Sequence, residues 1–157
     1  MPLLKVAKQQ KDAVLFIEIS GVVDETSAFE QLGPIQVSAL RIRCMGVTRI
    51  NSAGVRLWIK YFQDLKSRNM QITLVDCASV LVEQMNIIVN FAAGMAVESI
   101  MMPYSCSKCG ECFQVAGKVS DIKAKNYEIQ AEKCPKCGSS GSFDDLPDEY
   151  FHFMMRK

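Results

Sequence analysis

The stretch VTRINSAGVRLW, Val47 to Trp58, decides the fold of the first part of the chain. A strand-like run enters it and a helical pattern leaves it, with small polar residues from Asn51 to Gly54 at the corner between them. Ser52 could be a nucleophile, a phosphorylation site or only a helix cap. We expect Ser52 to start the helix as an N-cap, a contact that stabilises a helix by about 1 kcal/mol.

Strands and helices alternate on both sides of this corner. Upstream, the sequence predicts strands at Leu3–Lys8, Ala13–Ser20 and Ala39–Met45, with a short helix from Thr26 or Ser27 through Leu32. Downstream, it predicts a helix over Val55–Leu65, a strand at Met70–Val75, a helix from Ser79 through Ile88 and a last strand at Met95–Met101. This order predicts an α/β fold in which helices pack on a mixed β-sheet.

The composition is that of a globular protein with no charge bias. Of the 157 residues, 49% are hydrophobic and 22% charged, and the net charge of +1 does not favour nucleic acid or an anionic membrane. The start, MPLLKVAKQQKD, lacks the layout of a signal peptide. The apolar stretch Met85–Met102 is interrupted by Asn86, Asn90 and Glu98, so we expect no membrane insertion and a cytoplasmic protein.

The cysteines divide the chain in two. Cys44 and Cys77 lie within apolar patterns, whereas the other five of the seven cysteines fall between residues 106 and 137. This shift predicts one domain over residues 1–104 and a second module over 105–157, with Pro103 at the joint. The second module offers few apolar residues for a core. Modules this small need a further stabilising element, most often a metal ion or disulfide bonds.

The strongest motif is a repeat of CSKCG at 106–110 and CPKCG at 134–138. In each copy, two thiolates come from one tight turn, and the glycine after the second cysteine relieves the strain of that turn. Two such turns facing each other supply the four thiolates of a closed tetrahedral zinc site. The spacing therefore predicts a zinc ribbon with one structural zinc ion, and the segment between the turns can supply short strands at Phe113–Ala116, Lys118–Ile122 and Tyr127–Ala131. Its predicted ligands are Cys106, Cys109, Cys134 and Cys137.

Two other residues offer alternative metal chemistry. Cys112 extends the first motif to C-x-x-C-x-x-C, and Cys134 precedes a proline. Both features are similar to the cysteine pattern that binds iron–sulfur clusters, but that assignment would leave Cys137 without a role. The single histidine, His152, lies in YFHFMM, a run typical of module core or a docking surface. Four thiolates leave no open position for catalysis, and no nucleophile-elbow, phosphate-loop or dinucleotide motif is present. We therefore expect no enzyme activity and no small-molecule substrate.

Three segments together resemble a known family. GVVDETSAFEQL, VTRINSAGVRLW and QITLVDCASVLVEQM, in this order, are similar to the STAS domain of anti-sigma factor antagonists over roughly residues 1–104. The resemblance implies a small α/β domain that binds a protein partner, often an anti-sigma factor that is also a serine kinase. In that family, phosphorylation of the serine directly before the corner glycine turns binding off.

The matching positions place the docking surface and show two departures from the family pattern. Asp24 matches the acidic residue of the first turn, and Ser52 and Gly54 match the family's first corner serine and its glycine. Asn51 stands where the family has an aspartate, and Ala53 stands where it has the phosphorylated serine, so the usual switch cannot operate there. The implied partner-binding residues are Asp24, Asn51, Ser52, Ala53, Gly54 and Val55.

These observations lead to two functional hypotheses. The first is a non-enzymatic bacterial regulatory protein whose STAS-like domain docks an anti-sigma factor or a related kinase. The alternative is a nucleic-acid-associated or assembly adaptor that uses the zinc ribbon. Lysines at 118, 123, 125 and 133 give the ribbon some basicity, but acids at 144, 145, 148 and 149 offset it. A steep fall of affinity with salt would favour the adaptor.

Overall fold

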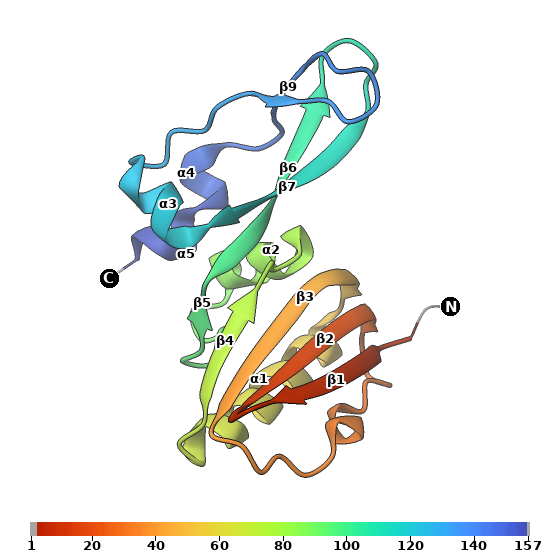
Figure 1. Cartoon of the computed structure of the whole chain (residues 1–157), viewed down its shortest axis with the longest axis vertical. Coiled ribbons are helices and arrows are strands. Elements are labelled where there is room, and N and C mark those ends of the chain that lie inside the picture. Colours follow the sequence, from red (N-terminus) through yellow and green to blue (C-terminus); the bar gives the residue numbers. More distant parts are fainter. Residues whose placement is uncertain (1–2, 157) are drawn as a thin grey trace.

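The computed structural model describes residues 3–156, which form two β-sheets with helices packed beside them (Figure 1). The first part contains, in chain order, β1 (Lys5–Lys11), β2 (Val14–Val23), a 3-10 helix η1 (Phe29–Leu32), β3 (Ala39–Ile50), α1 (Ser52–Ser67), β4 (Gln71–Val75), α2 (Ser79–Ile87) and β5 (Ala96–Val97). The second part contains β6 (Ser99–Cys106), β7 (Cys112–Lys118), α3 (Val119–Ala124), β8 (Glu132–Lys133), β9 (Ser140–Phe143), α4 (Pro147–Tyr150) and α5 (His152–Met155). The predicted α/β class with a mixed sheet is confirmed.

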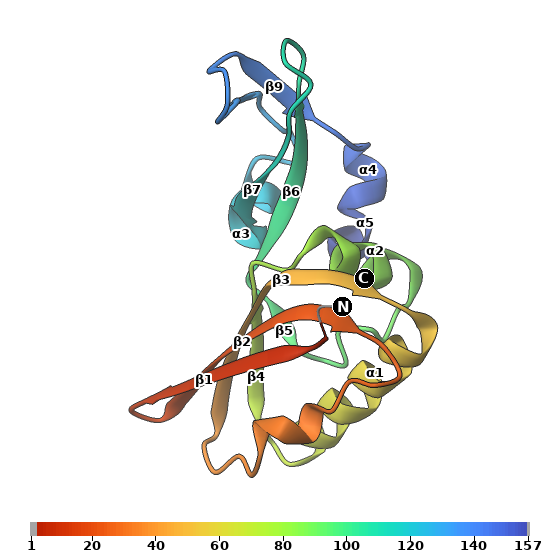
Figure 2. The ribbon, with the colours of Figure 1, turned by 90° about the vertical axis from the view of Figure 1, so that its right-hand side faces the viewer.

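The first sheet has the strand order β1-β2-β3-β4-β5. β1 pairs antiparallel with β2, and the other three pairs are parallel. The parallel pairs are connected in turn through η1, α1 and α2. Because such crossovers are right-handed and the strand order always advances in the same direction, these elements share one face of the sheet. Figure 2 shows α1 lying along that face.

Side-chain alternation explains which face is covered. Leu40, Ile42 and Cys44 of β3, which alternate along the strand, point to the helices and are at most 1% exposed. Arg41 and Arg43, between them, lie on the opposite face. From α1, Trp58 is fully buried, and its ring stacks on a phenylalanine of the loop before β5 with a centroid distance of 5.2 Å. The core of this part therefore lies between the sheet and its helices.

The second sheet has the order β7-β6-β9-β8, and all its pairs are antiparallel. Two of the strands expected in this module are absent. The segment expected as a strand at Lys118–Ile122 instead begins α3, and Tyr127–Ala131 precedes the short β8 without forming a strand. The core at the base of this sheet is aromatic. Its rings pack with centroid distances of 5.5–5.8 Å and belong to Tyr104, Phe113, Phe143, Tyr150 and Phe151.

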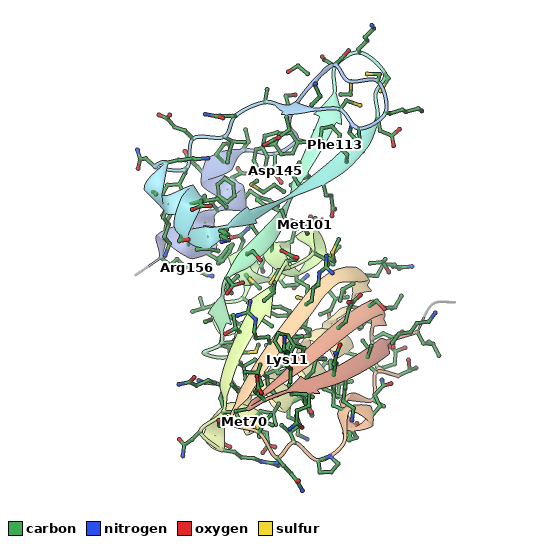
Figure 3. All side chains as sticks on the ribbon, in the orientation of Figure 1. Lys11, Met70, Met101, Phe113, Asp145 and Arg156 are labelled. Atoms are coloured by element: carbon green, nitrogen blue, oxygen red, sulfur yellow. The ribbon has the colours of Figure 1, made fainter. Side chains whose placement is uncertain are left out.

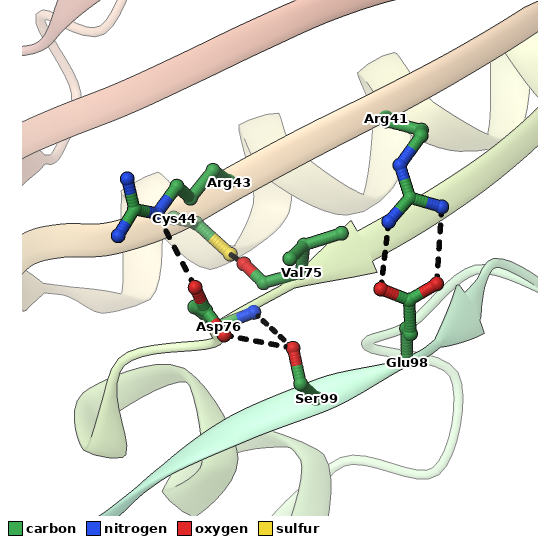
Figure 4. A network of polar contacts seen from close by, with 7 residues as sticks. All are labelled: Arg41, Arg43, Cys44, Val75, Asp76, Glu98 and Ser99. Atoms are coloured by element: carbon green, nitrogen blue, oxygen red, sulfur yellow. Dashed lines mark hydrogen bonds and ion pairs between the residues drawn. The ribbon is translucent and has the colours of Figure 1, made fainter. Parts of the chain in front are cut away.

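The predicted last strand of the first sheet, Met95–Met101, is wrong as a single element. Ala96–Val97 belongs to the first sheet, whereas Ser99 begins β6 of the second. The change of sheet falls at Glu98, and the predicted division at residue 104 lies inside β6. A polar network holds this crossing point (Figure 4). Arg41 donates two hydrogen bonds to Glu98, at 3.0 and 2.6 Å.

Beside this pair, Asp76 joins β3 to the start of β6. Its carboxylate accepts from Arg43 at 3.2 Å and from the Ser99 hydroxyl at 2.8 Å. Ser99 is only 5% exposed, and its hydroxyl also accepts from the Asp76 N–H. The two parts of the chain are therefore connected by side chains of the sheet as well as by the backbone.

The C-terminal helices α4 and α5 return to the first part and pack on α2. Asn86 of α2 donates to the Tyr150 carbonyl at 2.9 Å and accepts from the Phe153 N–H at 2.8 Å. The Tyr150 hydroxyl donates to the Met101 carbonyl, and burial raises the pKa of this phenol. Figure 3 shows Met101 at the same junction, between the two sheets. Within residues 3–156, no helix has the length and apolar character needed to cross a membrane.

Candidate metal centre and candidate docking corner

The four cysteines predicted as metal ligands come together at the far end of the second sheet. Cys106 and Cys109 belong to the turn between β6 and β7, and Cys134 and Cys137 to the turn between β8 and β9. Their sulfur atoms all lie within 4.8 Å of one another. Sulfur pairs join the two turns, at 3.5 Å for Cys106 with Cys137 and 3.6 Å for Cys109 with Cys134.

The two turns repeat the same backbone geometry. Gly110 and Gly138 have φ of 76° and 77°, the left-handed conformation that glycine adopts without strain. Gly110 N–H donates to the Cys106 carbonyl at 3.1 Å, and Gly138 N–H donates to the Cys134 carbonyl at 2.9 Å. The repeated C-x-x-C-G motif therefore folds as two equivalent turns that face each other.

Backbone N–H groups in these turns stabilise thiolates. The N–H groups of Cys109 and Lys108 point at the Cys106 sulfur, each at 3.4 Å, and they lower the pKa of Cys106 to about 6. The backbone at Ser139 likewise lowers the pKa of Cys137. Since metal ions bind the thiolate form, these contacts favour coordination by Cys106 and Cys137. Burial and the neighbouring sulfur atoms instead raise the pKa of Cys109 to about 12.

The sulfur spacing fits a tetrahedral ion. Four thiolates at the usual zinc–sulfur distance of about 2.3 Å stand about 3.8 Å apart. The two measured contacts of 3.5 and 3.6 Å lie close to that value. The group could therefore hold a single metal ion, and its four thiolates would fill a tetrahedral coordination shell.

The two alternative metal residues lie outside this group. Cys112 is exposed at the start of β7 and is not part of the four-sulfur cluster. His152 is exposed at the start of α5, whereas its neighbours Phe151 and Met154 are 0% and 8% exposed. Phe151 and Met154 therefore pack into the core, which is one of the two roles expected for this run, and the histidine is directed outward.

The corner at the start of α1 is capped by a different residue from the one predicted. The Asn51 side-chain oxygen accepts from the Gly54 N–H at 2.8 Å, which makes Asn51 the N-cap. Ser52 is the first helical residue and is exposed. Two other serines near helix starts do not cap either: Ser79 begins α2 without a side-chain cap, and the Ser27 hydroxyl accepts from the Asp24 N–H in the turn before η1.

The corner packs directly against the end of β2. A Cβ atom on Gly54 would lie 2.2 Å from the Val23 carbonyl oxygen, closer than any such pair can approach. The same carbonyl accepts from the Asn51 N–H at 3.2 Å. Glycine is therefore required at position 54, because only a residue without a side chain lets the helix start touch β2.

This approach brings the first turn and the corner onto one surface. Asn51 donates from its side chain to Glu25 at 2.9 Å, and this contact lowers the pKa of the Glu25 carboxyl. Asp24 accepts from the Thr26 N–H at 2.9 Å and from the Thr26 hydroxyl, which lower its pKa. Glu25 is the residue that the sequence interpretation missed. Its only signal was its place beside Asp24, which is equally typical of a solvated turn.

Among the predicted docking residues, exposure differs. Asn51 and Ser52 are exposed and Ala53 is partly buried, whereas Gly54 and Val55 are buried, Val55 at 7% exposure. A shallow groove of about 450 Å³ runs from this corner toward α2. Its lining includes Ile50, Asn51, Ser52, Val55, Arg56, Gln84 and Ile88.

No model of a known protein family matches this chain, and a search of curated proteins found no significant match. By its fold and its cysteines, the chain is a mixed α/β protein with a four-cysteine group that could hold a metal ion.

Proposed function

We propose that this protein is a non-enzymatic regulatory protein that docks a protein partner, in the manner of the STAS-type anti-sigma factor antagonists that its sequence resembles. The proposed docking surface comprises the turn at Asp24–Glu25 and the corner at Asn51–Val55. The partner would be an anti-sigma factor or a related signalling kinase. One observation carries the proposal: Gly54 brings the start of α1 against the end of β2, so that the turn and the corner form one surface.

The proposed docking site lacks the family's usual switch. Ala53 has no hydroxyl, so no phosphate can be added at the position where the resemblance implies one. A phosphate there would lie at a helix N-terminus and add about 1.5–2 negative charges to the surface. Asn51, in place of an aspartate, suits this chain because its amide donates to Glu25. We infer that docking is constitutive at this corner, or is controlled elsewhere in the chain.

The test is site-directed photocrosslinking in the native cell. A photoreactive amino acid replaces Ser52, which is exposed, and in a second strain it replaces Gln9, which is exposed on β1 away from the corner. We expect one protein with an anti-sigma factor or kinase domain to crosslink from position 52 only. Ala53→Asp, which mimics the phosphate charge, should abolish that crosslink. A crosslink insensitive to this charge, or the same product from both positions, would count against docking at the corner.

We further propose that the four-cysteine group holds one structural zinc ion. A soft thiolate set with tetrahedral spacing and no open position suits zinc better than magnesium or calcium, which prefer oxygen ligands. All seven cysteines are free thiols in the structure, which is typical of the reducing cytoplasm. Elemental analysis of the purified protein tests the identity of the metal. Zinc at about one ion per chain is expected, and iron with visible charge-transfer absorption would contradict the assignment.

A further inference from the structure

An apolar groove of about 400 Å³ lies where the two parts of the chain meet. From the first part, Met85 and Ile88 and the loop before β5 line it. From the second part, α3 and α5 contribute Val119, Lys123 and Phe153. A segment bound there would therefore contact both parts of the molecule at once.

The groove is bordered by the most exposed large apolar side chains of the described chain. Ile87 is 74% exposed and Val89 is 80% exposed, and they flank Ile88, which lines the groove. Single exposed hydrophobic residues are common, but a cluster beside an apolar groove marks an interaction site. Ile88 also lines the groove that starts at the corner of α1, so the apolar surface continues from one groove to the other.

The charged side chains that line the two grooves are all basic. Lys123 and Arg156 are the charged side chains that line the junction groove, and Arg56 is the charged side chain that lines the neighbouring one. The Arg156 guanidinium is positioned by a hydrogen bond to the Met85 carbonyl, and Figure 3 shows it where the second part meets the first. Lys123 is exposed and forms no ion pair within residues 3–156.

We propose that this junction groove binds a protein segment that carries apolar side chains flanked by carboxylates, such as an acidic amphipathic helix. The apolar side chains cover Ile88 and Val89, and the carboxylates pair with Lys123 and Arg156. Charge complementarity favours such a segment over a basic one, and the length of the combined apolar surface favours a peptide over a single small ligand. The neighbouring groove includes Asn51, Ser52 and Val55 of the proposed docking corner, whereas the junction groove includes none of them. The substitutions at Val89 and Lys123 therefore test the junction groove and not the corner.

A phage-displayed library of random peptides, selected against the full-length, zinc-loaded chain, tests this proposal. We expect the enriched peptides to combine apolar residues at helical spacing with Asp or Glu. Synthetic versions should lose affinity about tenfold or more, equivalent to about 1.4 kcal/mol, on Val89→Glu and on Lys123→Glu. Both side chains are exposed, so neither substitution should affect folding.

Leu146→Glu is the matched control, because Leu146 is 61% exposed in the second part and does not line the groove. This variant should bind the peptides like the wild type. The proposal is overturned if the enriched peptides lack acidic residues, or if Val89→Glu binds them unchanged. It is also overturned if a long-chain fatty acid or phosphatidylglycerol vesicles bind at the groove and no peptide does.

Discussion

The side-chain amide of Asn51 divides its hydrogen bonds between two elements. Its oxygen accepts from the Gly54 N–H, and its nitrogen donates to Glu25. Asn51→Ala removes the cap and should lower the free energy of unfolding by about 1 kcal/mol. Ser52→Ala, at the exposed first residue of α1, should change it by less than about 0.5 kcal/mol. Urea unfolding of the two variants distinguishes the cap from its neighbour, and equal effects would show that the cap is shared.

The same substitution makes a prediction about pH. The Asn51 amide lowers the pKa of the Glu25 carboxyl, whose usual value is 4.5, because it donates to the charged form. A group with a depressed pKa stabilises the fold above its unfolded pKa, and this contribution is lost as the pH falls through the folded pKa. We therefore expect Asn51→Ala to raise the Glu25 pKa toward 4.5, as measured by NMR titration. The stability difference from the wild type should narrow in acid, and a difference that widens in acid would contradict this.

Gly54 is the residue on which the corner depends sterically. A Cβ atom there would collide with the backbone of Val23, at 2.2 Å from the carbonyl oxygen, and backbone cannot move aside as a side chain can. Gly54→Ala should therefore cost about 1–3 kcal/mol of stability, as overpacking does in a close-packed interior. It should also disrupt partner binding at the proposed docking surface. Ala53→Gly, one residue earlier on the helix, is the control and should cost at most about 1 kcal/mol.

The sequence predicted the position of this corner but not its contacts. The change from a strand pattern to a helical pattern located the start of α1, and the glycine was recognised from the family resemblance. The predicted N-cap, Ser52, is wrong by one residue, because Asn and Ser are both good N-caps. Which of them caps depends on the Val23 carbonyl, which holds the Asn51 N–H from a distant part of the chain. The Glu25 contact is equally long-range, and no local pattern reports it.

At the scale of elements, Asn86 connects α2 to the C-terminal helices. Its amide bonds to the backbone of Tyr150 and of Phe153, at 2.9 and 2.8 Å. Asn86→Ala leaves a partly buried carbonyl and N–H without these partners, which should cost about 1–3 kcal/mol. Amide hydrogen exchange should then rise in residues 147–156 more than in the first sheet. Gln84→Ala, on the same helix and without a side-chain hydrogen bond to this region, should leave that exchange unchanged. A rise spread evenly over the chain would argue against a local role.

The element order of the first sheet was predictable, whereas the crossing between the sheets was not. Alternating and helical patterns locate β2, β3 and α1 because each has one buried and one open face. From Met95 to Met102 the apolar run shows no period, since both faces of β6 are covered. The run is divided between the two sheets at Glu98, which pairs with Arg41 of β3. These two residues lie 57 positions apart in the chain, so no local sequence pattern predicts their contact.

For the whole molecule, the four-cysteine group lies at the far end of the second sheet from the first part (Figure 1). Between them lies the aromatic cluster around Tyr104 and Phe143, and α4 and α5 pack on α2 beyond it. The metal end of this sheet has little apolar packing, because most residues of 106–112 and 134–140 are exposed. With the proposed zinc ion bound, the stability of this end would come mainly from metal coordination, whereas that of the base comes from the aromatic rings and the packing on α2.

We therefore expect removal of the metal to unfold the end of the second sheet that carries the four cysteines, and not the rest of the molecule. Without an ion, the four sulfur atoms within 4.8 Å of one another must bind protons or repel as thiolates, and the coordination energy that folds such modules is lost. A chelator, or Cys109→Ser, should abolish amide protection in the two cysteine turns, residues 106–112 and 134–140. The first sheet should keep its protection, and α4 and α5 should lose only part of theirs because Asn86 holds them to α2.

Cys112→Ser is the control, since this exposed thiol lies outside the group and its loss should change neither metal content nor exchange. Amide hydrogen exchange measures the protection, and elemental analysis of the same samples measures the metal content. A folded, metal-free protein with full protection at 106–112 and 134–140 would show that the thiols serve another purpose.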